Sequence, residues 1–111
     1  MNKKISGKVI HGQKEGRKLG FPTVNLRFTG RLAAGVYFGW VIVEGERYRA
    51  GIMHREGTDI VEAHILDFSQ DVYGKTIELE MGEKIREMLK FKNNSELIKQ
   101  IEKDLEIIRK K

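Results

Sequence analysis

Two oxygen-bearing side chains, Thr23 and Asn25, stand two positions apart just after Pro22, the single proline of the chain. Pro22 biases the residue before it toward an extended backbone, and in an extended backbone side chains two apart point to the same face. A hydroxyl and an amide carbonyl are hard oxygen donors, which Mg²⁺ takes beside waters and substrate phosphates. The spacing is therefore compatible with a magnesium site. A Thr/Asn turn that satisfies its own backbone has the same spacing and is the commoner outcome.

A second candidate group is the carboxylate of Glu62, which lies between two apolar residues in an alternating segment. A carboxylate on a strand beside an apolar core can act as a general base when its proton affinity is tuned toward neutrality. A solvated glutamate on a strand surface produces the same pattern and is more frequent. His64 shares the face of Glu62, but two ligands without a third make a weak case for zinc.

The third candidate is a segment in which glycines alternate with cations, formed by Gly12, Lys14, Gly16, Arg17, Lys18 and Gly20. It matches neither the phosphate loop with Gly-Lys-Ser/Thr nor the Gly-x-Gly-x-x-Gly of dinucleotide-binding folds. Glycines nevertheless allow the main chain to approach a phosphate, while the cations supply charge. A charged surface with turn glycines is the alternative interpretation.

Charge is distributed unevenly along the chain. Residues 1–31 carry eight basic side chains against one acidic, whereas residues 56–111 carry ten basic against thirteen acidic. A basic, glycine-containing end suits a polyanion such as a nucleotide or an RNA.

Several short strands and one helix must position these groups. Alternation and β-branched or aromatic content predict strands at 8–10, 35–43, 47–53, 60–68 and 75–81, with a tight turn at 44–46. The apolar residues of the tail then step by four, four and three, which indicates an amphipathic helix with Asn93 as N-cap and Glu96 completing a capping box; they are Leu97, Ile101, Leu105 and Ile108. This order predicts a small β-barrel or sandwich with a helix packed on it.

Length and composition bound the remaining possibilities. The chain has 111 residues, a formal net charge of +5 and no cysteine, so we expect one domain over 1–111 without disulfides or thiolate metal sites. It contains neither an apolar run long enough to span a bilayer nor the apolar stretch of a secretory signal. We therefore expect a cytoplasmic protein without a membrane partner.

Taken together, the motifs resemble the riboflavin kinase (flavokinase) family, in particular the kinase module of bacterial bifunctional riboflavin kinase/FAD synthetases. The most specific string is Leu-Gly-Phe-Pro-Thr-x-Asn at 19–25. The other matching blocks are 7–12, 35–40, 61–68, 71–75 and 85–91, which follow in the order of the family and, with the C-terminal helix, cover nearly the whole chain.

The resemblance implies a mainly β fold, a six-stranded antiparallel Greek-key barrel with a C-terminal α-helix. It implies transfer of the ATP γ-phosphate to the riboflavin 5′-hydroxyl, with Mg²⁺ or another divalent ion, so the partners are riboflavin/FMN and ATP/ADP. Glu62 is then the general base, Thr23 and Asn25 hold the metal, and the chain works as a monomer. The nucleotide-binding residues are Gly12, Lys14, Gly16, Arg17, Lys18, Gly20, Pro22, Thr23 and Asn25; the flavin-binding residues, in a loop and helix start that close over the ring, are Arg86, Met88 and Phe91.

The sequence departs from the family pattern in two places. Val24 replaces the usual alanine, and residues 51–59 are shorter than in the family and lack its second proline. The second departure motivates one alternative, a non-catalytic module that binds flavin or nucleotide. The basic N-terminal third motivates another, an RNA-binding barrel. Nucleic acid is not the expected partner, because Phe28, Tyr37, Phe38 and Trp40 are interpreted mainly as core or pocket residues. No adenylyltransferase segment is present, so FAD synthesis is not predicted.

Overall fold

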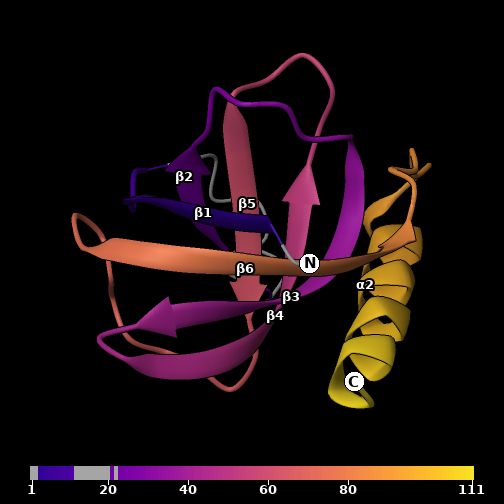
Figure 1. Cartoon of the computed structure of the whole chain (residues 1–111). Helices are drawn as coiled ribbons and strands as arrows, with labels where there is room; N and C mark the ends of the chain where they lie inside the picture. Colours follow the sequence, from indigo (N-terminus) through magenta and orange to yellow (C-terminus); the bar gives the residue numbers. More distant parts are fainter. Residues whose placement is uncertain (1–2, 12–20, 22) are drawn as a thin grey trace.

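The computed structural model describes residues 3–11, 21 and 23–111, which form six strands and a helix (Figure 1). The elements are β1 (Lys3–Lys8), β2 (Val24–Arg27), β3 (Gly35–Val43), β4 (Glu46–His54), β5 (Ile60–Ile65), β6 (Thr76–Arg86) and α2 (Asn94–Arg109). None of the helical residues described forms a segment long and apolar enough to cross a membrane.

The strands form one antiparallel sheet in the order β1-β6-β3-β4-β5-β2. Strands β3, β4 and β5 follow one another as hairpins, and β6 returns to lie beside β3, which is a Greek key. The sheet curls until its two edges meet: the Ile10 amide donates to the Asn25 carbonyl oxygen at 2.9 Å. The predicted six-stranded Greek-key barrel with a C-terminal helix is confirmed (Figure 1).

Alternation along the strands fills the barrel interior. Leu26, Val41, Ile52, Val61 and Leu79 each expose none of their surface and come from five different strands. Successive side chains of a strand point to opposite faces, so on each strand the residues adjacent to these point out of the barrel. The outward residues of β4 and β5 are the ones that build the site described below.

A close approach of two strands helps the sheet to curl. The register of β3 against β6 shifts on both sides of Tyr37, which is the signature of a β-bulge. At Gly39 a Cβ atom would lie 2.5 Å from the Glu80 carbonyl oxygen and 2.5 Å from the Ile52 Cδ1. Only glycine allows the two backbones to pass this closely.

Helix α2 begins where the sequence predicts. Asn93 is the N-cap, and its side chain accepts from the Glu96 amide at 2.9 Å. The Glu96 carboxylate accepts in return from the Lys92 amide at 3.2 Å, one residue earlier than in the standard capping box. The helix packs on the outside of β4, where Gly51 leaves room for the Ile108 side chain.

Several of the predicted elements differ from the structure in their bounds, and one strand was not predicted. The first strand covers residues 3–8 rather than 8–10, and a strand at 24–27 was not assigned. Strand β5 ends at residue 65 because Asp67 adopts a positive φ of 55°, which is incompatible with an extended strand. Strand β6 continues past residue 81 as far as Arg86, so Arg86 belongs to a strand end rather than to a loop.

Candidate active site between the barrel and the helix

A cavity of about 420 Å³ lies between the outer face of the barrel and helix α2. The helix contributes an apolar wall, and the segment after β6 adds Met88 and Phe91. The helical residues of this wall are those of the predicted apolar stripe: Leu97, Ile101, Leu105 and Ile108. The barrel side is more polar and includes Thr23, Arg55 and Glu62. The cavity therefore has one wall suited to a flat apolar ring and another that carries charge.

The register of β2 against β5 brings the candidate chemical groups together. Asn25 is the direct partner of Glu62, and directly opposed residues of antiparallel strands have their side chains on the same face. Thr23, two residues before Asn25, lines the cavity together with Glu62. Residues that are 37 positions apart in the sequence are thus neighbours because two short strands pair.

The side-chain carbonyl of Asn25 is the one buried side-chain oxygen or nitrogen in the described part of the chain that lacks a hydrogen-bond partner. Asn25 as a whole is 6% exposed. A buried carbonyl without a partner costs free energy, so such an atom in a folded protein calls for a donor or a cation. A neutral hard oxygen is a ligand type that Mg²⁺ takes, and Thr23, two residues earlier, carries another, although Asn25 itself is not among the residues that line the cavity. No group of three or more histidines, aspartates and glutamates able to hold a metal occurs among the residues that the structure describes.

Glu62 is largely sheltered and has an arginine beside it. Its side chain is 19% exposed, and its Oε2 lies 3.3 Å from Nη1 of Arg55, which also lines the cavity. Arg55 follows the last residue of β4, whereas Glu62 belongs to β5, so the β4–β5 hairpin builds the pair. The sequence analysis did not identify Arg55, although its place in the shortened 51–59 segment was a signal.

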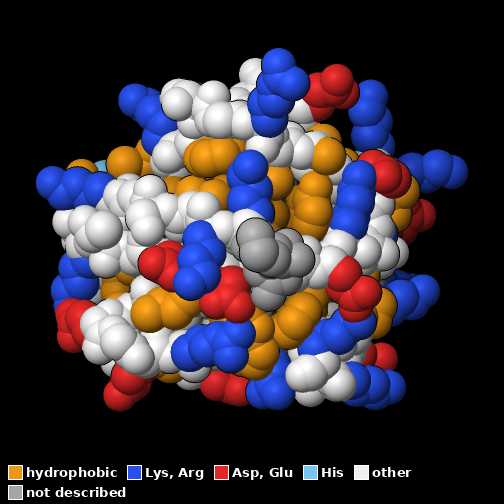
Figure 2. Space-filling model, in the orientation of Figure 1, with side chains coloured by type: hydrophobic (Ala, Val, Ile, Leu, Met, Phe, Trp, Pro, Cys, Tyr) orange, Lys and Arg blue, Asp and Glu red, His pale blue; other side chains and the backbone are white. Residues whose placement is uncertain are grey.

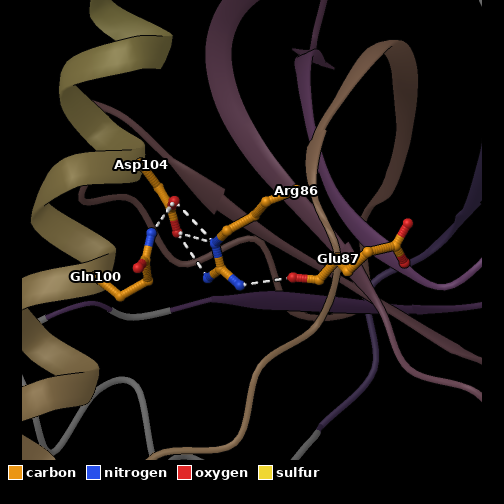
Figure 3. A network of polar contacts seen from close by, with 4 residues as sticks. All are labelled: Arg86, Glu87, Gln100 and Asp104. Carbon is orange, nitrogen blue, oxygen red and sulfur yellow. Dashed lines mark hydrogen bonds and ion pairs between the residues drawn. The ribbon is translucent and has the colours of Figure 1, made fainter.

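Arg86 lines the cavity, but its guanidinium is bound to helix α2 (Figure 3). Its Nε and Nη2 donate to the Asp104 carboxylate at 2.9 and 2.8 Å, and its Nη1 donates to the Glu87 carbonyl oxygen at 3.0 Å. Gln100 donates to the same carboxylate at 3.1 Å. The Arg86 and Asp104 side chains are only 16% and 9% exposed. In this structure the network fixes the helical wall of the cavity to the end of β6.

Asp104 and Gln100 were also missed by the sequence analysis. The signal for Asp104 was its position: it stands three residues after Ile101 and four before Ile108, inside the apolar stripe of the helix. A carboxylate in such a stripe needs a partner, since a buried charge is costly unless it is paired. His64 is a further cavity residue, and its ring meets the edge of Phe21 at a centroid distance of 6.0 Å.

Most of the predicted nucleotide-binding residues lie outside the described residues. These are Gly12, Lys14, Gly16, Arg17, Lys18, Gly20 and Pro22. Next to this segment, the His11 ring stacks on the Tyr73 ring with centroids 3.7 Å apart.

The interpretation of four aromatic residues as core or pocket was correct for two. Phe28 and Tyr37 pack against the core. Phe38 and Trp40 instead lie on the opposite, outward face of β3, where the Arg47 guanidinium stands 4.0 Å from the centre of the Trp40 ring. Arg47 also pairs with Glu80 at 2.9 Å. On the face drawn in Figure 2, Lys and Arg side chains are spread among acidic and apolar ones rather than gathered in one patch.

Comparisons with known proteins identify the family of this chain. A model described as flavokinase, riboflavin kinase, matches residues 1–111. A bifunctional riboflavin kinase/FMN adenylyltransferase of Haemophilus influenzae is 39% identical over 117 residues, which covers 93% of this chain and 36% of that protein. This chain thus spans little more than a third of the length of that curated relative.

Two solved structures share the fold. A riboflavin kinase of Trypanosoma brucei has a TM-score of 0.73 and 28% identity, over 96% of this chain and 74% of that one. A crystal structure described as a macrolide-efflux protein of Streptococcus pneumoniae has a TM-score of 0.86 and 34% identity, over 96% of this chain and 38% of that one. With a family model that matches its whole length, the chain belongs to the riboflavin kinase family.

Proposed function

We propose that this chain transfers the γ-phosphate of ATP to the 5′-hydroxyl of riboflavin, giving FMN and ADP. One observation carries the proposal beyond family membership: Thr23 and Glu62 line the same cavity, and the opposite wall of that cavity is apolar. A volume of about 420 Å³ is in the range of small-molecule sites. A kinase that acts on a flavin needs an apolar pocket for the ring and polar groups for phosphoryl transfer in the same cavity. This cavity has both kinds of lining residue.

The flavin ring fits the apolar part of the cavity. Helix α2 provides Leu97, Ile101 and Leu105, and the segment after β6 provides Met88 and Phe91. A planar ring placed against these side chains buries apolar surface on both faces, which is the main source of affinity for such a ligand. In this arrangement Arg86 acts through the helix, because its guanidinium is held by Asp104.

The phosphate end of the site is formed by neutral oxygens. Thr23 and Asn25 would hold Mg²⁺, and the unpartnered Oδ1 of Asn25 supports this assignment. The bound ion would neutralise charge on the phosphates of the nucleotide. The glycine- and lysine-containing segment 12–20 is proposed to bind the nucleotide on the basis of its sequence alone.

Glu62 is the proposed general base. Transfer of a phosphoryl group is mostly a matter of positioning and charge neutralisation, so one carboxylate that accepts the hydroxyl proton is enough. The pairing of β2 with β5 fixes Glu62 beside Asn25, and therefore beside the proposed metal ligands. The reacting hydroxyl would lie between the carboxylate and the metal.

A coupled assay tests this proposal. The purified chain is incubated with riboflavin, ATP and Mg²⁺, and FMN is separated from riboflavin by chromatography. We expect FMN formation to require the metal and to be abolished by EDTA. The proposal fails if no FMN forms with any of several divalent ions and nucleoside triphosphates. Riboflavin binding seen as fluorescence quenching, without turnover and without an effect of Glu62→Gln, would instead indicate the non-catalytic module.

The remaining expectations concern partners and location. We propose that the enzyme is a cytoplasmic monomer, and sedimentation of the purified chain tests the oligomeric state. Salt-dependent binding of an oligonucleotide tighter than that of ATP would favour the RNA-binding alternative. Arg47, which stands over the half-buried Trp40 ring, is already paired with Glu80, so the charge of Arg47 is not free for a polyanion.

A further inference from the structure

Arg55 is an arginine of the cavity, and most of its donors have no acceptor among the residues that the structure describes. Its only hydrogen bond in the described part of the chain joins Nη1 to Glu62 Oε2 at 3.3 Å, which is long for a charged pair. Its side chain is 59% exposed and lines the cavity. A guanidinium carries five N–H donors, so four remain available for another acceptor.

We propose that Arg55 binds the phosphate of the product, its charge passing from Glu62 to the new phosphate monoester as the reaction proceeds. This inference rests on the proposed function. It adds a phosphate-binding residue that directly follows β4 and lines the cavity. The occupant is a flavin 5′-phosphate rather than the nucleotide.

The charges of the reaction support this assignment. The riboflavin 5′-oxygen forms a bond to the γ-phosphorus, the bond from that phosphorus to the bridging oxygen breaks, and its electron pair leaves with ADP. The hydroxyl proton goes to Glu62. Glu62 is then neutral, so Arg55 has lost its anionic partner at the moment when a phosphate dianion has formed at the same end of the cavity. An exposed arginine side chain can reorient over this short distance, and its fork suits phosphate oxygens.

Among the residues that the structure describes, Arg86 and Arg27 do not offer the same chemistry. Arg86 lines the cavity, but it is held by both oxygens of the buried Asp104 carboxylate. Arg27 pairs with Asp59 at 3.2 Å and is 67% exposed, so it resembles Arg55 in its ion pair, yet it is not among the residues that line the cavity. Arg27 is therefore a matched control.

The experiment compares Arg55→Gln, Arg55→Lys and Arg27→Gln with the wild type. Dissociation constants for FMN and for riboflavin are measured by flavin fluorescence titration, and kcat and KM are measured in the FMN assay. We expect Arg55→Gln to weaken FMN binding by about tenfold or more, because a hydrogen-bonded charge is lost. Riboflavin binding should change little, since riboflavin carries no phosphate. Arg55→Lys should retain part of the preference for FMN, and Arg27→Gln should behave as the wild type.

The kinetic constants give an independent readout. In Arg55→Gln we expect kcat to fall while KM for ATP stays close to the wild-type value, because the nucleotide is held elsewhere. The proposal is overturned if Arg55→Gln weakens riboflavin and FMN equally, if it leaves the FMN preference unchanged, or if the wild type has no such preference. Failure of the kinase proposal is a separate result, namely absence of FMN formation by the wild type, because the titrations need no turnover.

Discussion

The two faces of strands β4 and β5 are built for different purposes. On the inner face, Ala50, Ile52, Val61 and Ala63 expose none of their surface and fill the barrel. On the outer face, the residues between them line the cavity: Gly51, Met53, Glu62 and His64. The same two strands therefore hold the fold together with one set of residues and carry the candidate chemistry with the other.

This division explains why the site can carry polar groups that are unpartnered or weakly paired. The inner face is dry and closely packed, so a change of even one methylene is costly there. The outer face tolerates the unpartnered side-chain carbonyl of Asn25 and the loosely paired Glu62 because the packing of the barrel interior does not use these side-chain groups. A slip of one residue in register would exchange the two faces, so the packing of the interior also fixes the site.

The largest effect should come from Glu62→Gln on the outer face. The loss of a general base lowers the rate by about 10²–10⁴-fold, whereas thermal stability should be nearly unchanged because the only partner of Glu62 among the described residues is an exposed arginine. The FMN assay and thermal melting measure the two quantities. Glu78→Gln is the control, since the ion pair that Glu78 forms within the described part of the chain is an exposed one with Lys4 and Glu78 does not line the cavity. A large loss of stability in Glu62→Gln would contradict the division between the faces.

Asp104→Ala should have the next largest effect. It removes the partner of Arg86 from a mostly buried pair and should cost about 3–5 kcal/mol of unfolding free energy. Because Asp104 fixes the helical wall, we also expect weaker riboflavin binding, measured by fluorescence titration. The double variant Arg86→Met/Asp104→Leu should recover much of the stability, since no charge is left buried without a partner. A double variant as unstable as the single one would contradict this account.

Ile52→Ala and Met53→Ala compare neighbouring residues on opposite faces. Ile52 is fully buried in the barrel, so its truncation should cost about 2–5 kcal/mol, measured by urea unfolding. Met53 lines the cavity, so its truncation should lower riboflavin affinity with a smaller cost in stability. At a temperature where both variants are folded, Ile52→Ala should bind riboflavin nearly as the wild type does. Similar losses of unfolding free energy and of riboflavin affinity in the two variants would contradict the division between the two faces.

The smallest effect concerns a surface pair remote from both faces. The hydrogen bond and charge of Lys75 lower the pKa of Glu44 below its ordinary value of 4.5. A carboxylate with a lowered pKa in the folded state adds stability above its unfolded pKa, and this contribution is lost as the pH falls through the folded pKa. Because Glu44 is fully exposed, we expect the melting temperature of Glu44→Gln to match that of the wild type at neutral pH within error. If the melting temperature of Glu44→Gln is clearly lower than that of the wild type at neutral pH and equal to it in acid, the Glu44–Lys75 pair contributes more stability than we expect.

Much of the architecture could be predicted because it follows from local patterns. The hairpin of β3 and β4 and the cap of α2 depend on residues that are near one another in the sequence, and both were found. Strand β1 was misplaced because Ile5 is its only large apolar residue, and the strand owes its place to pairing with β6. Its apolar partners Ile77 and Leu79 pair with residues 70 and 74 positions earlier in the chain, where no local pattern reveals them.

For the candidate site, the sequence proposed individual residues but not the contacts between them. The type and spacing of Thr23, Asn25 and Glu62 suggested oxygen ligands and a base, and the pairing of β2 with β5 brings them together. The partners Arg55 and Asp104 depend on which side chains meet after the hairpin closes and the helix docks. Those contacts are tertiary, so periodicity and spacing carry no direct signal for them.

The cavity has one wall from the barrel and one from the last quarter of the chain, which follows β6 in the sequence. A ring bound between these walls touches both, so it adds cohesion at the seam where the helix joins the barrel. Occupancy and helix docking are then thermodynamically linked: a ligand that needs both walls holds them together, and loosening the helix releases the ligand.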